Sequence, residues 1–155
     1  MTLQLDKDLF QDMVAFYGNL YGLAPLSAKV LVYLLFDFKR EGVTFEELTD
    51  TLKVSKSSLS GSLQTLVQNK HVEYVTGIDS RKRLYRTDPD YVYIRFSEVL
   101  DNLTREKSLI SRLKGFQTHL GCEKEFVSEK LNEYTEILDE HISTLTTTLQ
   151  KLKNN

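Results

Sequence analysis

The sequence predicts a mainly α-helical protein with one small β-hairpin and two long helices at its C-terminal end. Apolar residues recur every three or four positions along most of the 155-residue chain, which is typical of helices with one buried face. Two short segments, HVEYV and RLYRT, alternate instead, as strands do. Residues 90–153 contain no proline and only two glycines, which favours long helices.

Two helices are expected before residue 40. Residues 6–20 form an amphipathic pattern, and we expect its apolar face to pack into the core. That face consists of Leu9, Met13, Phe16 and Leu20. Ser27 is expected to cap a second helix over residues 28–38, which is apolar nearly all round and should therefore be central.

The next two helices are short and close together. TFEE is a capping box, in which Thr44 and Glu47 can satisfy each other's backbone amides, and it predicts a helix over residues 45–52. Only three residues, 53–55, precede the following helix, and Ser55 is a suitable N-cap for it. Two short helices joined by a tight turn form a helix-turn-helix.

The second of these helices is rich in poor helix formers. The segment LKVSKSSLSGSLQTL contains five serines and one glycine, both weaker helix formers than alanine. Leu59, Leu63 and Leu66 form its buried stripe, so the small and hydroxyl-bearing residues face away from the core. Small side chains allow close approach to a DNA major groove, and hydroxyl groups can bond to phosphates or base edges. We therefore predict that this is a recognition helix.

A β-hairpin is expected directly after the recognition helix. HVEYV and RLYRT supply its strands, and GIDSRK between them carries turn formers and charge. This hairpin is the predicted wing. Arg81, Lys82 and Arg83 at its tip are placed to reach along the DNA backbone or into a narrow minor groove.

Positive charge is concentrated around these two elements, although the chain has a net charge of −2. Residues 53–86 carry seven basic and two acidic side chains. By contrast, residues 1–52 carry four basic and eight acidic side chains, and residues 87–155 carry nine basic and twelve acidic side chains. A local basic footprint is sufficient for phosphate binding. We predict double-stranded DNA as the partner, with Gln64 as the best candidate for a bidentate contact to adenine. The predicted DNA-binding residues are Thr44, Lys53, Ser55, Lys56, Ser57, Ser58, Ser60, Gly61, Ser62, Gln64, Arg81, Lys82 and Arg83.

Two long helices are expected over residues 90–119 and 123–153, with Asp88 and Pro89 at the start of the first. Each would be about 45 Å long, more than the preceding domain can cover, so a partner helix is implied. The apolar stripe of the second begins at Val127 and has nearly heptad spacing, which predicts dimerisation. The predicted dimerisation residues are Leu131, Tyr134, Leu138, Ile142, Leu145 and Leu149.

These elements predict two domains. Residues 1–89 form a winged helix-turn-helix DNA-binding domain, whose first helix is shared with the dimer interface. Residues 90–155 form a helical dimerisation arm.

Residues 26–75 resemble the winged helix of MarR-type bacterial transcriptional regulators, in particular the GbsR-like branch. SKSSLSGSLQTL is similar to that branch's recognition-helix pattern SKG.VS..L..L, and GIDSRKRLYR is similar to its wing pattern GSRR.YY. The resemblance covers about residues 9–95. It implies a homodimer with interdigitating terminal helices that binds a pseudo-palindromic operator and usually represses transcription.

The chain departs from that pattern at two positions. Ser57 stands where the pattern has glycine, and no glycine follows the recognition helix. The second departure requires Asn69 to adopt a left-handed conformation, or the turn to bend differently.

Other chemistries find little support in the sequence. The three histidines are far apart and lack ligand partners at metal-binding spacing, so neither a zinc site nor a cofactor is expected. No phosphate-binding glycine loop or nucleophile elbow occurs, which argues against an enzyme. Cys122 could sense oxidants, although a lone cysteine is more often inert. The absence of a membrane-span or signal-peptide pattern favours the cytoplasm.

Two further hypotheses stay open. Aromatic residues could line a pocket for a small-molecule effector between the winged helix and the arm, although core packing is the ordinary explanation for them. The GbsR-like branch includes choline-responsive regulators, and an aromatic cage suits a quaternary ammonium. The aromatic residues are Phe10, Phe16, Tyr17, Tyr21, Tyr33, Phe36, Phe38, Tyr91, Tyr93 and Phe96. Alternatively, the winged helix and the acidic arm could dock another protein without binding DNA.

Overall fold

The computed structural model describes residues 3–78, 81–122 and 125–154. The chain divides into two units, Met1–Tyr91 and Val92–Asn155. Predictions made for residues 79–80 in the hairpin turn, for residues 123–124 at the start of the last helix and for the side chain of Val127 lie outside what is described.

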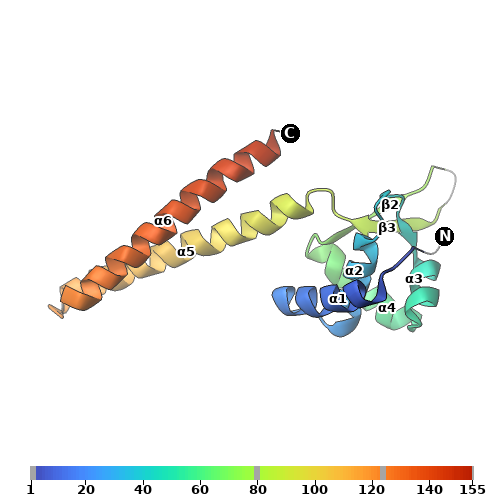
Figure 1. Ribbon diagram of the computed structural model, residues 1–155, viewed down its shortest axis with the longest axis horizontal. Helices are drawn as coiled ribbons and strands as arrows, with labels where there is room; N and C mark the ends of the chain where they lie inside the picture. The colour runs from blue at the N-terminus through green and yellow to red at the C-terminus, as the bar shows by residue number, and fades with distance from the viewer. Residues whose placement is uncertain (1–2, 79–80, 123–124, 155) are drawn as a thin grey trace. The chain divides into compact units, whose positions relative to one another are not determined.

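The first unit is helical with a small sheet (Figure 1). Its helices are α1 (Lys7–Tyr21), α2 (Pro25–Leu35), α3 (Phe45–Leu52) and α4 (Lys56–Gln68). Its strands are β1 (Val43–Thr44), β2 (Val72–Thr76) and β3 (Arg83–Thr87), arranged antiparallel in the order β1-β3-β2. The predicted mainly helical fold with a hairpin wing is confirmed, and β1 is an additional strand.

Strand β1 was not predicted, because a segment of only two residues shows no alternating pattern. It pairs with β3 through Val43 opposite Tyr85. Gly42 leads into it with a φ of 83°, and a Cβ on Gly42 would lie 2.8 Å from the Cβ of Leu84. Glycine at this position therefore permits the close approach of β1 to β3.

Helix α2 forms the centre of the core, as expected, but its predicted ends were wrong. It begins at Pro25, because proline lacks an N–H and suits the first helical position, so Ser27 lies inside the helix and is buried rather than capping it. It ends at Leu35 instead of residue 38. The buried carboxylate of Asp37 accepts hydrogen bonds from the backbone amides of Glu41 and Gly42 at 3.3 and 2.7 Å, which stabilises the turn that follows.

Helix α1 packs on the core with a different face from the one predicted. Phe10, Tyr17 and Tyr21 contact the core cluster. By contrast, Leu9, Phe16 and Leu20 are 50%, 55% and 44% exposed, so the prediction that this stripe is buried in the core was wrong for the single chain. Helix α1 thus presents an apolar stripe that the rest of the first unit leaves uncovered.

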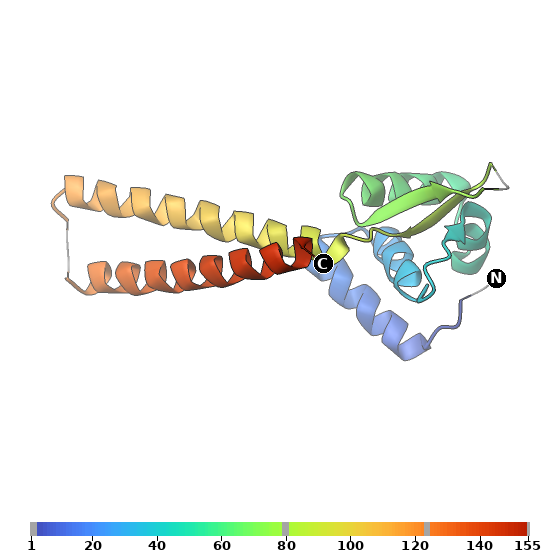
Figure 2. The same ribbon diagram turned by 90° about the horizontal axis from the view of Figure 1, so that it is seen from above.

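The helix-turn-helix is confirmed in its main features. The Thr44 hydroxyl accepts from the Glu47 amide at 3.1 Å, and the Ser55 hydroxyl accepts from the Ser58 amide at 3.2 Å. Lys53 ends α3 in a left-handed conformation with a φ of 52°. Figure 2 shows α3 and α4 beside the sheet in the first unit.

The turn after α4 bends differently from the first option that the sequence suggested. Asn69 has a φ of −83° and is not left-handed. Lys70 takes the left-handed conformation instead, with a φ of 58°. The His71 amide then donates to the Leu66 carbonyl at 2.9 Å, which satisfies one of the free carbonyls at the helix end.

A buried tyrosine joins α2 to the start of α3. The Tyr33 hydroxyl accepts from the Leu3 amide at 3.3 Å and donates to the Glu47 carboxylate at 3.0 Å. Burial raises the pKa of Tyr33 above its ordinary value, so the phenol remains a donor throughout the neutral range.

Replacing Tyr33 by phenylalanine is expected to destabilise the protein by about 1–3 kcal/mol, because both of these hydrogen bonds are lost while the ring is kept. Urea denaturation would measure the change. An unchanged midpoint would show that neither hydrogen bond contributes to stability.

The second unit is a helical hairpin. Helices α5 (Tyr91–His119) and α6 (Glu125–Lys153) run antiparallel, close to the predicted bounds. They are joined by a hydrogen bond from Lys114 Nζ to Asn132 Oδ1, by an ion pair between Lys107 and Asp139, and by a hydrogen bond from Tyr134 to Glu106. Just before α5, the Asp88 carboxylate accepts from the Asp90 amide at 2.9 Å, so Asp88 and Pro89 form a turn that leads into the helix.

Packing of α5 against α6 leaves apolar side chains of this unit exposed. Leu138 and Leu149 of α6 are buried within the single chain. The exposed apolar residues of α5 include Leu109, Leu113 and Phe116, and Leu120, directly after the helix, is exposed as well. No helix among the described residues combines the length and the apolar character that crossing a bilayer requires.

Candidate nucleic-acid interface

One side of α4 faces away from the core and carries small or uncharged residues. Leu59, Leu63 and Leu66 are buried, as predicted, and this fixes the rotation of the helix. We call the opposite side the outward face; its residues are Ser57, Ser60, Gly61, Gln64 and Gln68, all exposed. A Cβ built on Gly61 meets no atom within 4 Å, so the backbone is accessible there.

A lysine stands at the N-terminal end of α4. Lys56 is the first residue of α4 and is exposed. The N-terminal end of a helix carries partial positive charge, which the lysine ammonium reinforces. Lys53 is exposed in the preceding turn. This end of α4 therefore favours a phosphate group.

Several of the predicted DNA-binding residues also have local structural roles. Thr44 caps α3. Ser55 caps α4, and its hydroxyl donates to the Ser58 hydroxyl at 2.8 Å. Ser62 is half-buried on the flank of α4. Part of the serine content of the segment is thus explained by helix capping rather than by a surface for a partner.

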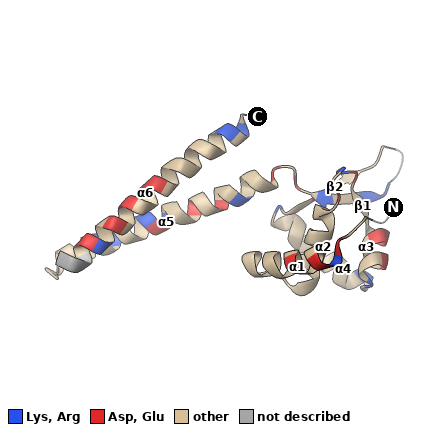
Figure 3. Ribbon diagram, in the orientation of Figure 1, with Lys and Arg blue, Asp and Glu red and all other residues tan. Residues whose placement is uncertain are grey.

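The wing, which comprises β2, β3 and the turn between them, carries basic residues in different environments. Figure 3 shows basic residues on the hairpin and acidic residues on α3. Lys82 lies 3.9 Å from the Glu46 carboxylate, and both side chains are exposed. Arg86 is bound to Glu73 on the neighbouring strand at 2.7 Å. Arg81 is exposed near the tip.

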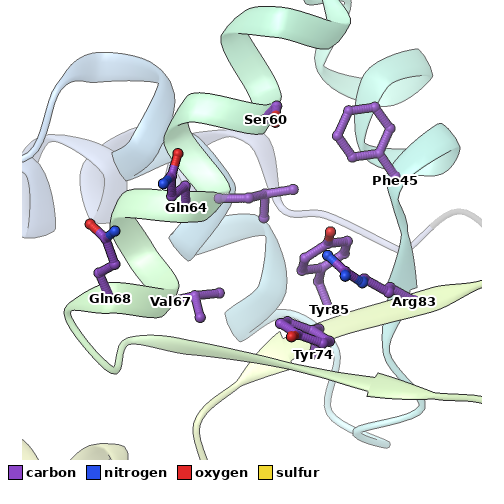
Figure 4. Close-up of a pocket in the computed structure, with 9 residues that line it drawn as sticks. Phe45, Ser60, Gln64, Val67, Gln68, Tyr74, Arg83 and Tyr85 are labelled. Atoms are coloured by element: carbon purple, nitrogen blue, oxygen red, sulfur yellow. The ribbon is translucent and has the colours of Figure 1, made fainter.

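Arg83 does not extend from the tip, as the sequence suggested, because it is the first residue of β3. Its guanidinium carbon lies 4.4 Å from the centroid of the Tyr74 ring, within the range of a cation–π contact. The side chain therefore folds across the hairpin towards α4 (Figure 4).

A pocket of about 300 Å³ lies between the outward face of α4, the start of α3 and the wing (Figure 4). Sequence reasoning missed five of its lining residues, because the pocket is formed by α3, α4 and the wing together and local patterns do not show how these elements pack. Those five are Phe45, Val67, Gln68, Tyr74 and Tyr85; Ser60, Leu63, Gln64 and Arg83 complete the lining. None of the nine is acidic.

Within the first unit, the aromatic residues named in the sequence analysis form two separate clusters. One cluster joins Phe36 to Phe10 and Phe38, with ring centroids 6.2 and 6.0 Å apart. A second cluster is centred on Tyr21, whose hydroxyl lies 2.8 Å from that of Tyr91. Tyr33 is buried in the core. These arrangements are core and surface packing within the unit, and the effector pocket predicted between the winged helix and the arm stays a hypothesis.

The described residues offer no group of three or more histidine, cysteine or acidic side chains that could hold a metal ion. Cys122 is exposed, and its thiol donates to the Leu120 carbonyl at 3.6 Å. Redox sensing by Cys122 stays a hypothesis, which unchanged DNA affinity after peroxide treatment would contradict.

If the predicted DNA interface includes the wing, replacing Glu46 by glutamine is expected to strengthen DNA binding about two- to fivefold at low salt. The substitution removes the carboxylate beside Lys82 without changing its size, so more positive charge is left to face phosphates. Fluorescence anisotropy with a labelled duplex would measure the affinity. Weaker binding by Glu46→Gln would indicate that Glu46 itself supports the interface.

Comparison with solved structures shows the fold. The chain is similar to a crystal structure described as that of a transcriptional regulator, with a TM-score of 0.61 and 19% identity over 96% of this chain and 98% of that chain. Weaker likenesses include Staphylococcus aureus MepR in a complex with DNA (TM-score 0.43, 15% identity, 94% and 89% covered). Another is a Lactococcus lactis ZitR variant in the apo form (TM-score 0.40, 14% identity, 88% and 98% covered). No protein-family model matches the chain, and no curated protein matches it significantly.

The first of these likenesses extends over nearly the whole of both chains. The winged helix-turn-helix and the helical arm are therefore parts of one known architecture, that of a winged-helix protein with long C-terminal helices. The fold defines this class, and the function follows from the site that the chain carries on it.

Proposed function

We propose that this protein is a sequence-specific transcriptional regulator that binds double-stranded DNA as a homodimer. The observation that carries the proposal is the outward face of α4. Its side chains are uncharged, and its backbone is accessible at Gly61. Lys56 lies at the N-terminal end of the helix, and the basic wing lies beside it. A helix of this kind can enter the major groove while the wing contacts the backbone or the adjacent minor groove.

The polar side chains suggest how the DNA is read. Gln64 is exposed on the outward face and has the amide group that pairs with adenine. Ser57 and Ser60 can donate to or accept from several bases or a phosphate, and so they position the helix more than they specify a sequence. Lys53, Lys56, Arg81 and Lys82 supply the salt-dependent part of the affinity.

Exposed apolar stripes support dimerisation. Leu9, Phe16 and Leu20 of α1 are exposed in the single chain, and so is the apolar stripe of α5. Soluble monomers rarely leave such contiguous apolar surface in water. We propose that a second copy covers these stripes. Of the dimerisation residues predicted on α6, Leu138 and Leu149 are buried within the single chain and Tyr134 donates to Glu106 of α5, so these three would support the interface from within the hairpin.

The sequence resemblance favours a MarR-type regulator of the GbsR-like branch, located in the cytoplasm, that represses transcription from a pseudo-palindromic operator. Two-fold operator symmetry would follow from the two-fold symmetry of a dimer. A small-molecule effector belongs to the same proposal as a hypothesis, and a ligand screen without thermal shifts would weaken it.

Salt dependence tests the proposal against the alternative of a protein-docking module. We expect affinity for a labelled duplex to fall steeply as the salt concentration rises, because phosphate contacts release counterions. Sedimentation of the free protein should give the mass of a dimer. Negligible affinity for any duplex at low salt would reject the DNA-binding proposal and favour protein docking by the winged helix and the arm.

A further inference from the structure

We infer that Arg83 contacts a DNA phosphate beside the recognition helix, and that the ring of Tyr74 is the positioning group that holds it there. This inference rests on the proposed DNA-binding function and adds two residue roles to it. It separates Arg83 from Arg81 and Lys82, with which the sequence groups it at the hairpin tip.

The register of the hairpin places the two side chains on one face of the sheet. Tyr74 lies opposite Tyr85, and Arg83 is two residues before Tyr85 on the same strand. Side chains two residues apart point to the same side of a strand, so Arg83 is the diagonal neighbour of Tyr74. That side faces the pocket that α4 borders (Figure 4).

The contact leaves the guanidinium able to bind an anion. Its carbon lies over the Tyr74 ring, 4.4 Å from the ring centroid, so the contact is made to the face of the ring. The N–H groups of a guanidinium lie in its plane and remain available for a bidentate bond to a phosphate. Because the ring already restricts the side chain, less rotamer entropy is lost on binding.

Charge distribution favours Arg83 over its basic neighbours. Arg86 is bound to Glu73, and Lys82 lies near Glu46, so carboxylates offset the charge of both. The Tyr74 ring is neutral, and the nine residues that line the pocket include no acidic side chain. Gln64 and Gln68 line the same pocket from α4. A phosphate beside α4 would therefore meet one cation whose charge no lining carboxylate offsets.

Four variants in the full-length protein test the inference. Arg83→Ala is expected to weaken duplex binding about tenfold, as loss of a charge-assisted contact would, and to lower the slope of log affinity against log salt by about 1. Tyr74→Leu is expected to weaken binding about threefold, although Tyr74 itself makes no contact with DNA. Tyr74→Phe keeps the ring and should bind like the wild type. The double variant Arg83→Ala plus Tyr74→Leu should be no weaker than Arg83→Ala alone.

Thermal melts of the same variants separate positioning from loss of fold. Tyr74 is nearly half exposed, so its replacement should leave the protein folded. Additive losses in the double variant, or wild-type affinity and salt slope in Arg83→Ala, would overturn this inference while leaving the DNA-binding function intact. Absence of salt-dependent binding by the wild type would overturn both.

Discussion

Replacing Gly61 by glutamate is expected to abolish detectable binding to duplex DNA while the protein stays folded. Gly61 lies on the outward face of α4, and a Cβ there meets no atom within 4 Å, so the new side chain fits without strain. Glutamate is also a better helix former than glycine. Its carboxylate would face the DNA phosphates, and like charges brought together at an interface cost several kcal/mol, which corresponds to a loss of at least about 100-fold.

A smaller substitution distinguishes close approach from charge. Gly61→Ala and Gly115→Ala both fill open space on a helix, and each is expected to stabilise the protein by about 0.5–1 kcal/mol. Only Gly61→Ala should weaken DNA binding, because its methyl group separates the helix from the groove. Anisotropy titrations and thermal melts measure both effects. Unchanged affinity in Gly61→Ala and Gly61→Glu would place the DNA-binding surface elsewhere.

Replacing Leu59 by alanine is expected to destabilise the protein by about 2–5 kcal/mol. Leu59 is fully buried and belongs to the core cluster with Leu31 and Leu48, so the substitution leaves a cavity beneath α4. Since small domains are stable by only about 5–15 kcal/mol, a large share of the folding free energy would be lost.

The neighbouring residue provides the control for this prediction. Ser60→Ala changes an exposed side chain on the same helix and should alter stability by no more than about 0.5 kcal/mol. Urea denaturation monitored by circular dichroism would compare the two variants. Equal midpoints for Leu59→Ala and the wild type would contradict the assignment of α4 to the core.

Local signals in the sequence predicted the winged helix well. The stripe of Leu59, Leu63 and Leu66 determined the rotation of α4, and the caps at Thr44 and Ser55 determined where two helices begin. These features depend on residues within one or two turns of each other, which is why a single sequence is sufficient to recognise them.

Helix α1 shows where periodicity is insufficient. The stripe containing Leu9, Phe16 and Leu20 and the one containing Phe10 and Tyr17 both have helical spacing. Only the second packs on the core of the chain. Amphipathic spacing indicates that the apolar face of a helix packs against another surface. It does not indicate whether that surface belongs to the same chain or to a second copy.

The details of the candidate interface depend on contacts between distant residues. The pairing of Tyr74 with Arg83 requires the strand register, and the Lys82 to Glu46 contact requires α3 and the wing to lie together. Neither follows from local patterns. The sequence therefore located the basic segment correctly and assigned its three tip residues one shared role, whereas the structure gives each a different environment.

Selection from a pool of random duplex DNA tests the central claim most directly, with the wild type compared with Arg81→Ala plus Arg83→Ala. The account predicts that the wild type enriches a two-fold-symmetric site and that the double variant loses this enrichment. A circular dichroism melt would confirm that the variant is folded. If the wild type enriches no sequence and binds negligibly at low salt, the account of a dimeric DNA-binding regulator is contradicted.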